Sequence, residues 1–112
     1  RYMSARIVTP QQNLASIIAN APNNTVIKLT AGIFHLQPQQ PHQQGVLIQN
    51  KRGLIITGSG RDQTTVKLAT HVDVGFLIGS KVEDLKIENL HIQGTPPFKN
   101  KYGRHRQHIN MF

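Results

Sequence analysis

An internal repeat of about thirty residues constrains the fold more than any other feature of the sequence. Gly45-Val-Leu-Ile-Gln-Asn-Lys51 aligns with Gly75-Phe-Leu-Ile-Gly-Ser-Lys81 at an offset of thirty. Leu54-Ile-Ile-Thr-Gly58 aligns with Leu85-Lys-Ile-Glu-Asn89 at thirty-one, so one residue is inserted between the two segments, and a looser match joins 25–29 to 65–68. A period of this length, carried by short strands, indicates a solenoid in which equivalent strands lie side by side and parallel.

The segments between the repeats also favour short strands. They are β-branched or leucine-rich runs, separated mostly by Gly, Asn, Pro or Asp. An antiparallel barrel or sandwich would need tight hairpin turns such as Asn-Gly or Asp-Gly, and the sequence has none. Eight strands are predicted, at 25–29, 33–36, 46–49, 54–57, 65–68, 76–78, 85–87 and 90–93.

One amphipathic helix is predicted before these strands. Thr9-Pro10-Gln11-Gln12 fits a capping box with proline at the first helical position. The helix should run for about three turns and stop at Ala21-Pro22, and we expect it to cover the open end of the first strands. Its predicted apolar stripe consists of Leu14, Ile17, Ile18 and Ala21.

The stretch Gly58-Ser59-Gly60 follows a predicted strand and could be taken for a phosphate-binding loop. Such a loop needs a helix behind it, with its N-terminal amides directed at the anion. Here another predicted strand follows, and Gly58 aligns with Asn89 one repeat later. Because Gly and Asn adopt left-handed backbone angles most readily, we interpret the stretch as a corner and predict a positive φ at Gly58.

The charge of the chain favours polyanionic partners. Thirteen Lys and Arg against five Asp and Glu give a formal net charge of +8, which suits nucleic acid, acidic lipid or acidic polysaccharide. The chain has no cysteine and no apolar run long enough to span a membrane, so no disulfide framework and no transmembrane segment are predicted. We expect a single domain over 1–112 with a basic loop at 95–108, which holds Lys99, Lys101, Arg104 and Arg106.

Three stretches carry a resemblance to a known family. Segment 14–34 has a predicted helix that leads through Ala-Pro and a polar turn into a strand. Segment 53–66 has an apolar strand followed by Gly-x-Gly, a charged pair and Thr. Segment 82–94 resembles the coil that follows in that family. Over roughly 10–95 the chain resembles the N-terminal coils of the pectin-lyase-like superfamily. The resemblance implies an all-β fold, a right-handed parallel β-helix (solenoid) of about three coils with an N-terminal amphipathic capping helix.

The resemblance specifies the fold more closely than the activity, because the family includes polyuronate lyases, methylesterases, hydrolases, epimerases, tailspikes and adhesins. It implies the N-terminal part of a secreted, periplasmic or cell-surface protein acting on acidic polysaccharide as a lyase, epimerase or hydrolase. The alternatives are a non-catalytic carbohydrate-binding or adhesin module and a basic nucleic-acid-binding domain. Family catalytic residues lie in middle coils, so none is assigned here, and we expect this segment alone to be inactive.

Five residues are candidates for ligand binding. Lyases and epimerases of acidic sugars need a cation to neutralise the uronate carboxylate and a base to remove the C5 proton. Lys67, Lys86 and His91 would supply these groups if they share one sheet, while Phe98 and Tyr102 in the basic loop could stack on sugar rings. No metal site or cofactor is predicted, since His105-x-x-His108 has no Asp, Glu or Cys close to it in sequence.

The side chains of the predicted strands divide into inward and outward sets. Phe34 and Phe76 are predicted in the core, whereas His35 and His91 should point outward. The chain ends at 108–112 with an apolar segment that resembles the start of another strand, so we expect a fragment of a longer protein. We also expect self-association through an uncapped last coil, whose apolar residues are Leu85, Ile87, Leu90 and Ile92.

Overall fold

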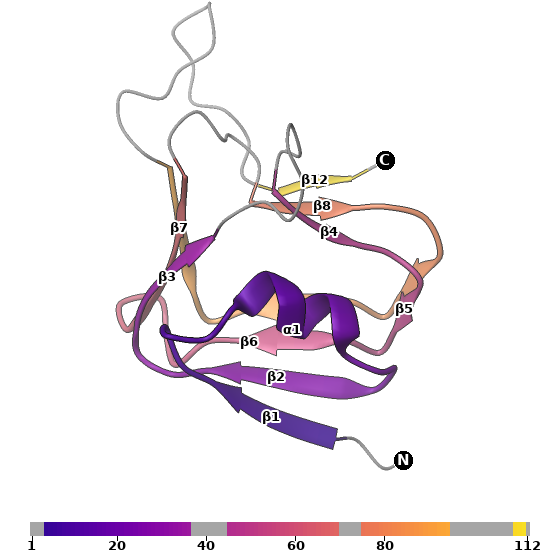
Figure 1. The fold of residues 1–112 in the computed structure, drawn as a ribbon, viewed down its shortest axis with the longest axis horizontal. Helices are drawn as coiled ribbons and strands as arrows, with labels where there is room; N and C mark the ends of the chain where they lie inside the picture. Colours follow the sequence, from indigo (N-terminus) through magenta and orange to yellow (C-terminus); the bar gives the residue numbers. More distant parts are fainter. Residues whose placement is uncertain (1–3, 37–44, 70–74, 95–108, 112) are drawn as a thin grey trace, which may run out of the picture.

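The computed structural model describes residues 4–36, 45–69, 75–94 and 109–111. The predicted basic loop at 95–108, with Phe98 and Tyr102, lies outside these residues. Most of the described chain is in strands, accompanied by a single short helix (Figure 1). That helix is too short to cross a membrane.

All strand pairing among the described residues is parallel, and it forms four short sheets. Sheet A has the order β1-β2-β6-β10, sheet B β11-β7-β3, sheet C β12-β8-β4 and sheet D β5-β9. In Figure 1 the labelled strands of sheets A, B and C lie below, to the left of and above helix α1. The strands are β1 (Ser4–Val8), β2 (Thr25–Leu29), β3 (Gly32–Leu36), β4 (Val46–Ile48), β5 (Lys51–Arg52), β6 (Ile55–Thr57), β7 (Thr64–Leu68), β8 (Phe76–Ile78), β9 (Val82–Glu83), β10 (Lys86–Glu88), β11 (His91–Gln93) and β12 (Ile109–Met111).

The sequence repeat corresponds to side-by-side strands. Val46 on β4 pairs with Phe76 on β8, and Ile55 on β6 pairs with Lys86 on β10, which reproduces both offsets of the repeat. The looser match was wrong, because β2 pairs with β6 while β7 pairs with β3 in another sheet. Parallel pairing of equivalent segments is therefore a property of this chain.

The predicted right-handed parallel β-helix of about three coils is wrong for the described residues. They form four separate sheets of two to four short strands, and no closed helix or solenoid is present among them. Repeated strands can pair in parallel without the chain closing into coils.

Helix α1 (Leu14–Asn20) is shorter than predicted. Asn13, not Thr9, caps it by accepting a hydrogen bond from the Ser16 amide at 3.0 Å. The Thr9 amide does donate to Gln12 Oε1 at 2.9 Å, but this bond closes a separate turn directly after β1. The helix stops at Ala21, as predicted.

The core lies between the sheets and under α1. Strand residues alternate between buried and outward positions, and Phe34 and Phe76 are buried as predicted. Helix α1 packs against β3 and β4 at one end of the stacked strands. We call the strands that occupy successive positions across the sheets strand layers; β10 and β11 belong to the last layer, and β6 and β7 to the layer before it. At this opposite end Leu85, Ile87 and Ile92 remain partly exposed. Their neighbours one layer earlier, Leu54, Ile56 and Val66, are 0% exposed.

The Gly58 corner differs from the prediction in its backbone. The φ angle of Asn89 is 60°, but Gly58 is absent from the described residues with positive φ. Six residues, 58–63, separate β6 from β7, whereas two separate β10 from β11, so the aligned positions have different local geometry. Gly58 is needed for space, because a Cβ there would overlap the Asn89 carbonyl oxygen and lie 2.9 Å from Thr64 Cβ.

The corner is not a phosphate-binding loop. The backbone amides of Gly58 and Gly60 donate to the carbonyl oxygens of Glu88 and Asn89, at 3.0 and 2.9 Å. The Ser59 amide donates to Thr64 Oγ1 at 2.9 Å, and Ser59 Oγ donates to the Leu29 carbonyl at 2.9 Å. The donors that a phosphate would require are therefore already used, by the Ser59 amide within the corner and by the other three donors between neighbouring segments.

A second set of corners stacks in register. Asn24, Gly53 and Asp84 precede equivalent residues of β2, β6 and β10, and their φ angles are 61°, 71° and 54°. A Cβ at Gly53 would overlap Asn24 Oδ1 and lie 3.3 Å from Asn24 Cγ. The left-handed conformation recurs in all three layers, but the middle layer has no room for a side chain.

Candidate anion-binding sites

The outward-facing side chains of sheet B form the first candidate site, which we call the sheet B face. The described strands place His35 beside Lys67 and Lys67 beside Gln93, so the three form one row across β3, β7 and β11. Neighbouring strands are about 4.8 Å apart, so adjacent side chains in this row lie close enough to bind one ligand group. The face consists of Ile33, His35, Thr65, Lys67, His91 and Gln93.

The electrostatic character of the sheet B face is set by the ionisable side chains of its three strands. β3, β7 and β11 contain one ammonium group, on Lys67, and two imidazoles, but no Asp or Glu. His35 and His91 are exposed, as predicted, while Thr65 and Lys67 are half-buried by their neighbours. The face therefore offers cationic and hydrogen-bond donor groups to an anion, without a carboxylate in these strands to repel it.

The sheet B face brings together two of the five predicted site residues. Lys67 and His91 lie on adjacent strands, one row apart. Lys86 is on β10 in sheet A, on the other side of the Asn89 corner, and Phe98 and Tyr102 lie outside the described residues. His35 was predicted to point outward but was not chosen as a site residue, because the register that places it beside Lys67 could not be read from the sequence.

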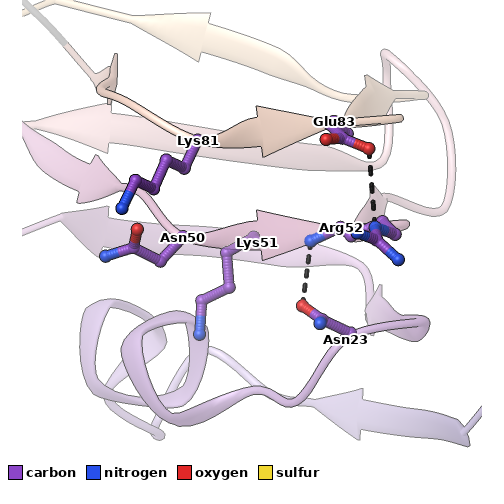
Figure 2. Close-up of a pocket in the computed structure, with 6 residues that line it drawn as sticks. All are labelled: Asn23, Asn50, Lys51, Arg52, Lys81 and Glu83. Carbon is purple, nitrogen blue, oxygen red and sulfur yellow. Dashed lines mark hydrogen bonds and ion pairs between the residues drawn. The ribbon is translucent and has the colours of Figure 1, made fainter.

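A polar hollow forms the second candidate site, which we call the corner hollow. It has a volume of about 340 Å³ and lies at β5 and β9, next to the end of α1 (Figure 2). Two of its residues, Asn50 and Lys81, are equivalent positions just before these strands. It is lined by Asn23, Asn50, Lys51, Arg52, Lys81 and Glu83.

Lys51 binds the end of helix α1. Its Nζ donates to the carbonyl oxygens of Ala19 at 2.9 Å and Ala21 at 2.7 Å, which would otherwise lack partners at the helix C-terminus. Desolvation by burial lowers the pKa of Lys51, whereas the two carbonyl oxygens favour its charged form. Two of the three Nζ–H groups are used in this way, so one remains for another partner.

Arg52 and Glu83 close the other side of the corner hollow. Arg52 Nε lies 3.4 Å from Glu83 Oε1, and both side chains are about two-thirds exposed, at 65% and 67%. An ion pair this exposed contributes little to stability. The backbone amide of Arg52 donates to Asn23 Oδ1 at 2.9 Å, which fixes the side chain of Asn23 (Figure 2).

Comparison of the chain with protein-family models, curated proteins and solved structures gives no match in any of the three. The resemblance to pectin-lyase-like proteins therefore stays a prediction. Within the described residues, no three His, Asp or Glu side chains gather in a way that could hold a metal ion.

Proposed function

We propose that this chain binds an acidic polysaccharide through the sheet B face, and that it does so at the cell surface, in the periplasm or after secretion. The observation that carries the proposal is the row of His35, Lys67 and Gln93 on three neighbouring strands that contain no carboxylate. Lys67 would pair with a sugar carboxylate, and the amide and imidazoles would bind hydroxyl groups.

The composition of the face favours a polysaccharide over single-stranded nucleic acid. Proteins that bind single strands without sequence preference stack bases on aromatic rings between their cations. The outward side chains of β3, β7 and β11 include no Phe, Tyr or Trp. An acidic glycan presents carboxylates together with many hydroxyl groups. The single ammonium group of Lys67, next to the imidazole of His35 and the amide of Gln93, can bind both kinds of group.

A lyase or epimerase activity is the second candidate. Its support is the pairing of His35 with Lys67 across β3 and β7, which brings an imidazole base beside a cation that could neutralise a uronate. A lyase would produce an unsaturated sugar, detectable by its ultraviolet absorbance after incubation with polygalacturonate or alginate. Binding without product, and without epimerised residues in the nuclear magnetic resonance spectrum, would leave the non-catalytic function.

The binding proposal is tested by electrophoresis through gels that contain polygalacturonate or alginate. We expect wild-type protein to be retarded, and Lys67→Gln to bind roughly threefold more weakly, as expected for about 0.7 kcal/mol from an exposed charge pair. Lys28→Gln is the matched control, since Lys28 is exposed on β2 in sheet A and the change removes the same charge.

Lys67→Gln and Lys28→Gln remove the same charge from different sheets, so the comparison tests the position of the charge and not the net charge. Equal retardation of Lys67→Gln and Lys28→Gln would contradict the sheet B site. Lys86→Gln would show whether the predicted site residue on β10 contributes, and a neutral dextran gel should retard none of the proteins. Tighter binding to a single-stranded oligonucleotide than to every glycan would favour the nucleic-acid alternative.

We also propose that the chain associates with copies of itself through its last strand layer. Leu85, Ile87 and Ile92 are partly exposed there, whereas the equivalent residues one layer earlier are fully buried. β10 and β11 are edge strands of sheets A and B in the described part of the chain. Apolar side chains beside an unpaired strand edge favour pairing with another chain.

A further inference from the structure

We propose that the corner hollow is an oxyanion-binding site, separate from the sheet B face, that holds a carboxylate or sulfate group between Lys81 and Asn50. A volume of about 340 Å³ falls at the lower end of the range of small-molecule sites, roughly 300–1,000 Å³. Its lining includes three cations, on Lys51, Arg52 and Lys81, and a single carboxylate, on Glu83. The site does not depend on the proposed polysaccharide function.

The backbone at Lys81 is the first observation that supports this site. Lys81 has φ 58° and its partner in the preceding layer, Asn50, has φ 56°. Asparagine tolerates this left-handed conformation, but lysine adopts it at a cost in free energy. Among the described residues with positive φ, Lys81 is the one that is neither Gly, Asn nor Asp. A strained residue at a polar hollow points to a use for its side chain.

The free charge of Lys81 is the second observation. Its ammonium group has no hydrogen bond or ion pair with any described residue, while the single lining carboxylate pairs with Arg52. Figure 2 shows Lys81 and Asn50 on one side of the hollow, away from the Arg52–Glu83 pair. An ammonium group and a side-chain amide on adjacent layers can both donate to the oxygens of one anion.

Lys51 would add to the anion affinity of the site from the side next to the end of α1. Its Nζ is held by the carbonyl oxygens of Ala19 in α1 and of Ala21, the C-cap residue, which fixes one positive charge at the hollow before a ligand arrives. A fixed cation loses less conformational freedom on binding than a mobile one. The arrangement favours small oxyanions over neutral sugars, because the hollow already contains more cations than carboxylates.

The test is a titration of the whole chain with sodium sulfate and with galacturonate, followed through the amide signals of Asn50 and Lys81 by nuclear magnetic resonance. Glucose serves as the neutral control. Shifts at these two residues with either anion, and none with glucose, would support the site. Shifts with galacturonate alone would indicate that the site also recognises the sugar. Shifts with sulfate alone would indicate a site for inorganic oxyanions. No shift with either anion would overturn the proposal.

Substitution of Lys81 separates binding from folding. Lys81→Asn keeps a residue suited to the left-handed conformation, so the melting temperature should rise by roughly 4 °C or more, while anion affinity falls about fivefold. Lys81→Arg should retain the affinity because it keeps the cation. Unchanged affinity in Lys81→Asn would overturn the proposal. Lys67→Gln should leave the shifts at Asn50 unchanged, so failure of the sheet B site would not be confused with failure of this one.

Discussion

Gly58 is tightly enclosed, because Thr64 and two residues of the next corner, Asn89 and Leu90, lie against the space that its side chain would occupy. The overlap with the Asn89 carbonyl oxygen and the contact with Thr64 Cβ apply to any side chain, whatever its backbone preference. We therefore expect Gly58→Ala and Gly58→Asn to lower the free energy of unfolding alike, by about 1–3 kcal/mol, the scale of overpacking in a filled space. Urea denaturation of the two variants measures this.

Asn89→Gly is the matched control for Gly58. Asn89 has φ 60°, which Gly adopts without strain, and the change removes one exposed hydrogen bond of 3.1 Å, from Asn89 Nδ2 to Thr57 Oγ1. The loss should stay below about 0.5 kcal/mol, as for other exposed positions. Tolerance of Gly58→Asn would contradict the steric overlap proposed for this position.

Lys51 should contribute to stability through the end of helix α1. Lys51→Met keeps much of the side-chain length but removes both hydrogen bonds to the carbonyl oxygens of Ala19 and Ala21. We expect the free energy of unfolding to fall by about 0.5–1.5 kcal/mol, measured by urea denaturation. Lys28→Met, on the exposed side of β2, should have a smaller effect, and equal losses would contradict the helix-binding role.

The Lys51 contribution should also depend on pH. Burial lowers the pKa of Lys51 below its ordinary value of 10.5, so in alkaline solution the folded state releases this proton before the unfolded state does. The free energy of unfolding contributed by Lys51 therefore rises as the pH increases from the lowered pKa toward 10.5. This gain disappears when the pH is brought back below the lowered pKa. The stability gap between wild type and Lys51→Met should widen over that interval, and a constant gap would contradict the shift.

At the scale of elements, the strands were easier to predict than the ends of the helix. Every predicted strand is present with bounds that differ by at most one residue, because alternating β-branched residues require a half-buried strand. β1 was missed, as were the two-residue strands β5 and β9, which carry almost no periodic pattern. The helix begins late because Thr9–Gln12 forms a separate turn after β1, in which the Gln12 amide donates to the Thr9 carbonyl oxygen at 3.0 Å.

Helix α1 offers a test of which side faces the core. Ile18 is 0% exposed, whereas Ile17 is only partly buried against the core. Ile18→Asp should therefore prevent folding or remove about 3 kcal/mol or more, because it buries an unpaired carboxylate and empties a packed position. Ile17→Asp should be milder, as judged by soluble yield and thermal unfolding. The reverse order would mean that the helix is rotated about its axis.

At the scale of the whole molecule, the arrangement of the candidate sites depends on register, which the sequence does not reveal. Alternation predicted correctly that His35 and His91 point outward, but it could not show that β7 lies between β3 and β11 and places Lys67 next to His35. Lys86 and His91 are close in sequence and lie in different sheets, because Asn89 turns the chain between β10 and β11. The corner hollow was missed because its residues come from three separate segments.

The partly exposed last layer leads to a prediction about association. Sedimentation velocity at several concentrations should show species larger than the monomer, in amounts that increase with concentration. Ile87→Lys places a charge on β10 among the apolar side chains and should reduce association, since charged residues on edge strands oppose pairing. Lys28→Gln provides a control with an unaltered last layer. A monomer at every concentration would contradict the proposal.

The stacked corners at Asn24, Gly53 and Asp84 have an evolutionary consequence. The side chain of Asn24 occupies the space where a Cβ at Gly53 would lie, so a change at position 53 has an effect set by the residue at position 24. Gly53→Asn alone should be harmful, whereas Asn24→Gly should first open the space and make the same change acceptable. The order in which two such substitutions arise then decides whether the intermediate sequence still folds.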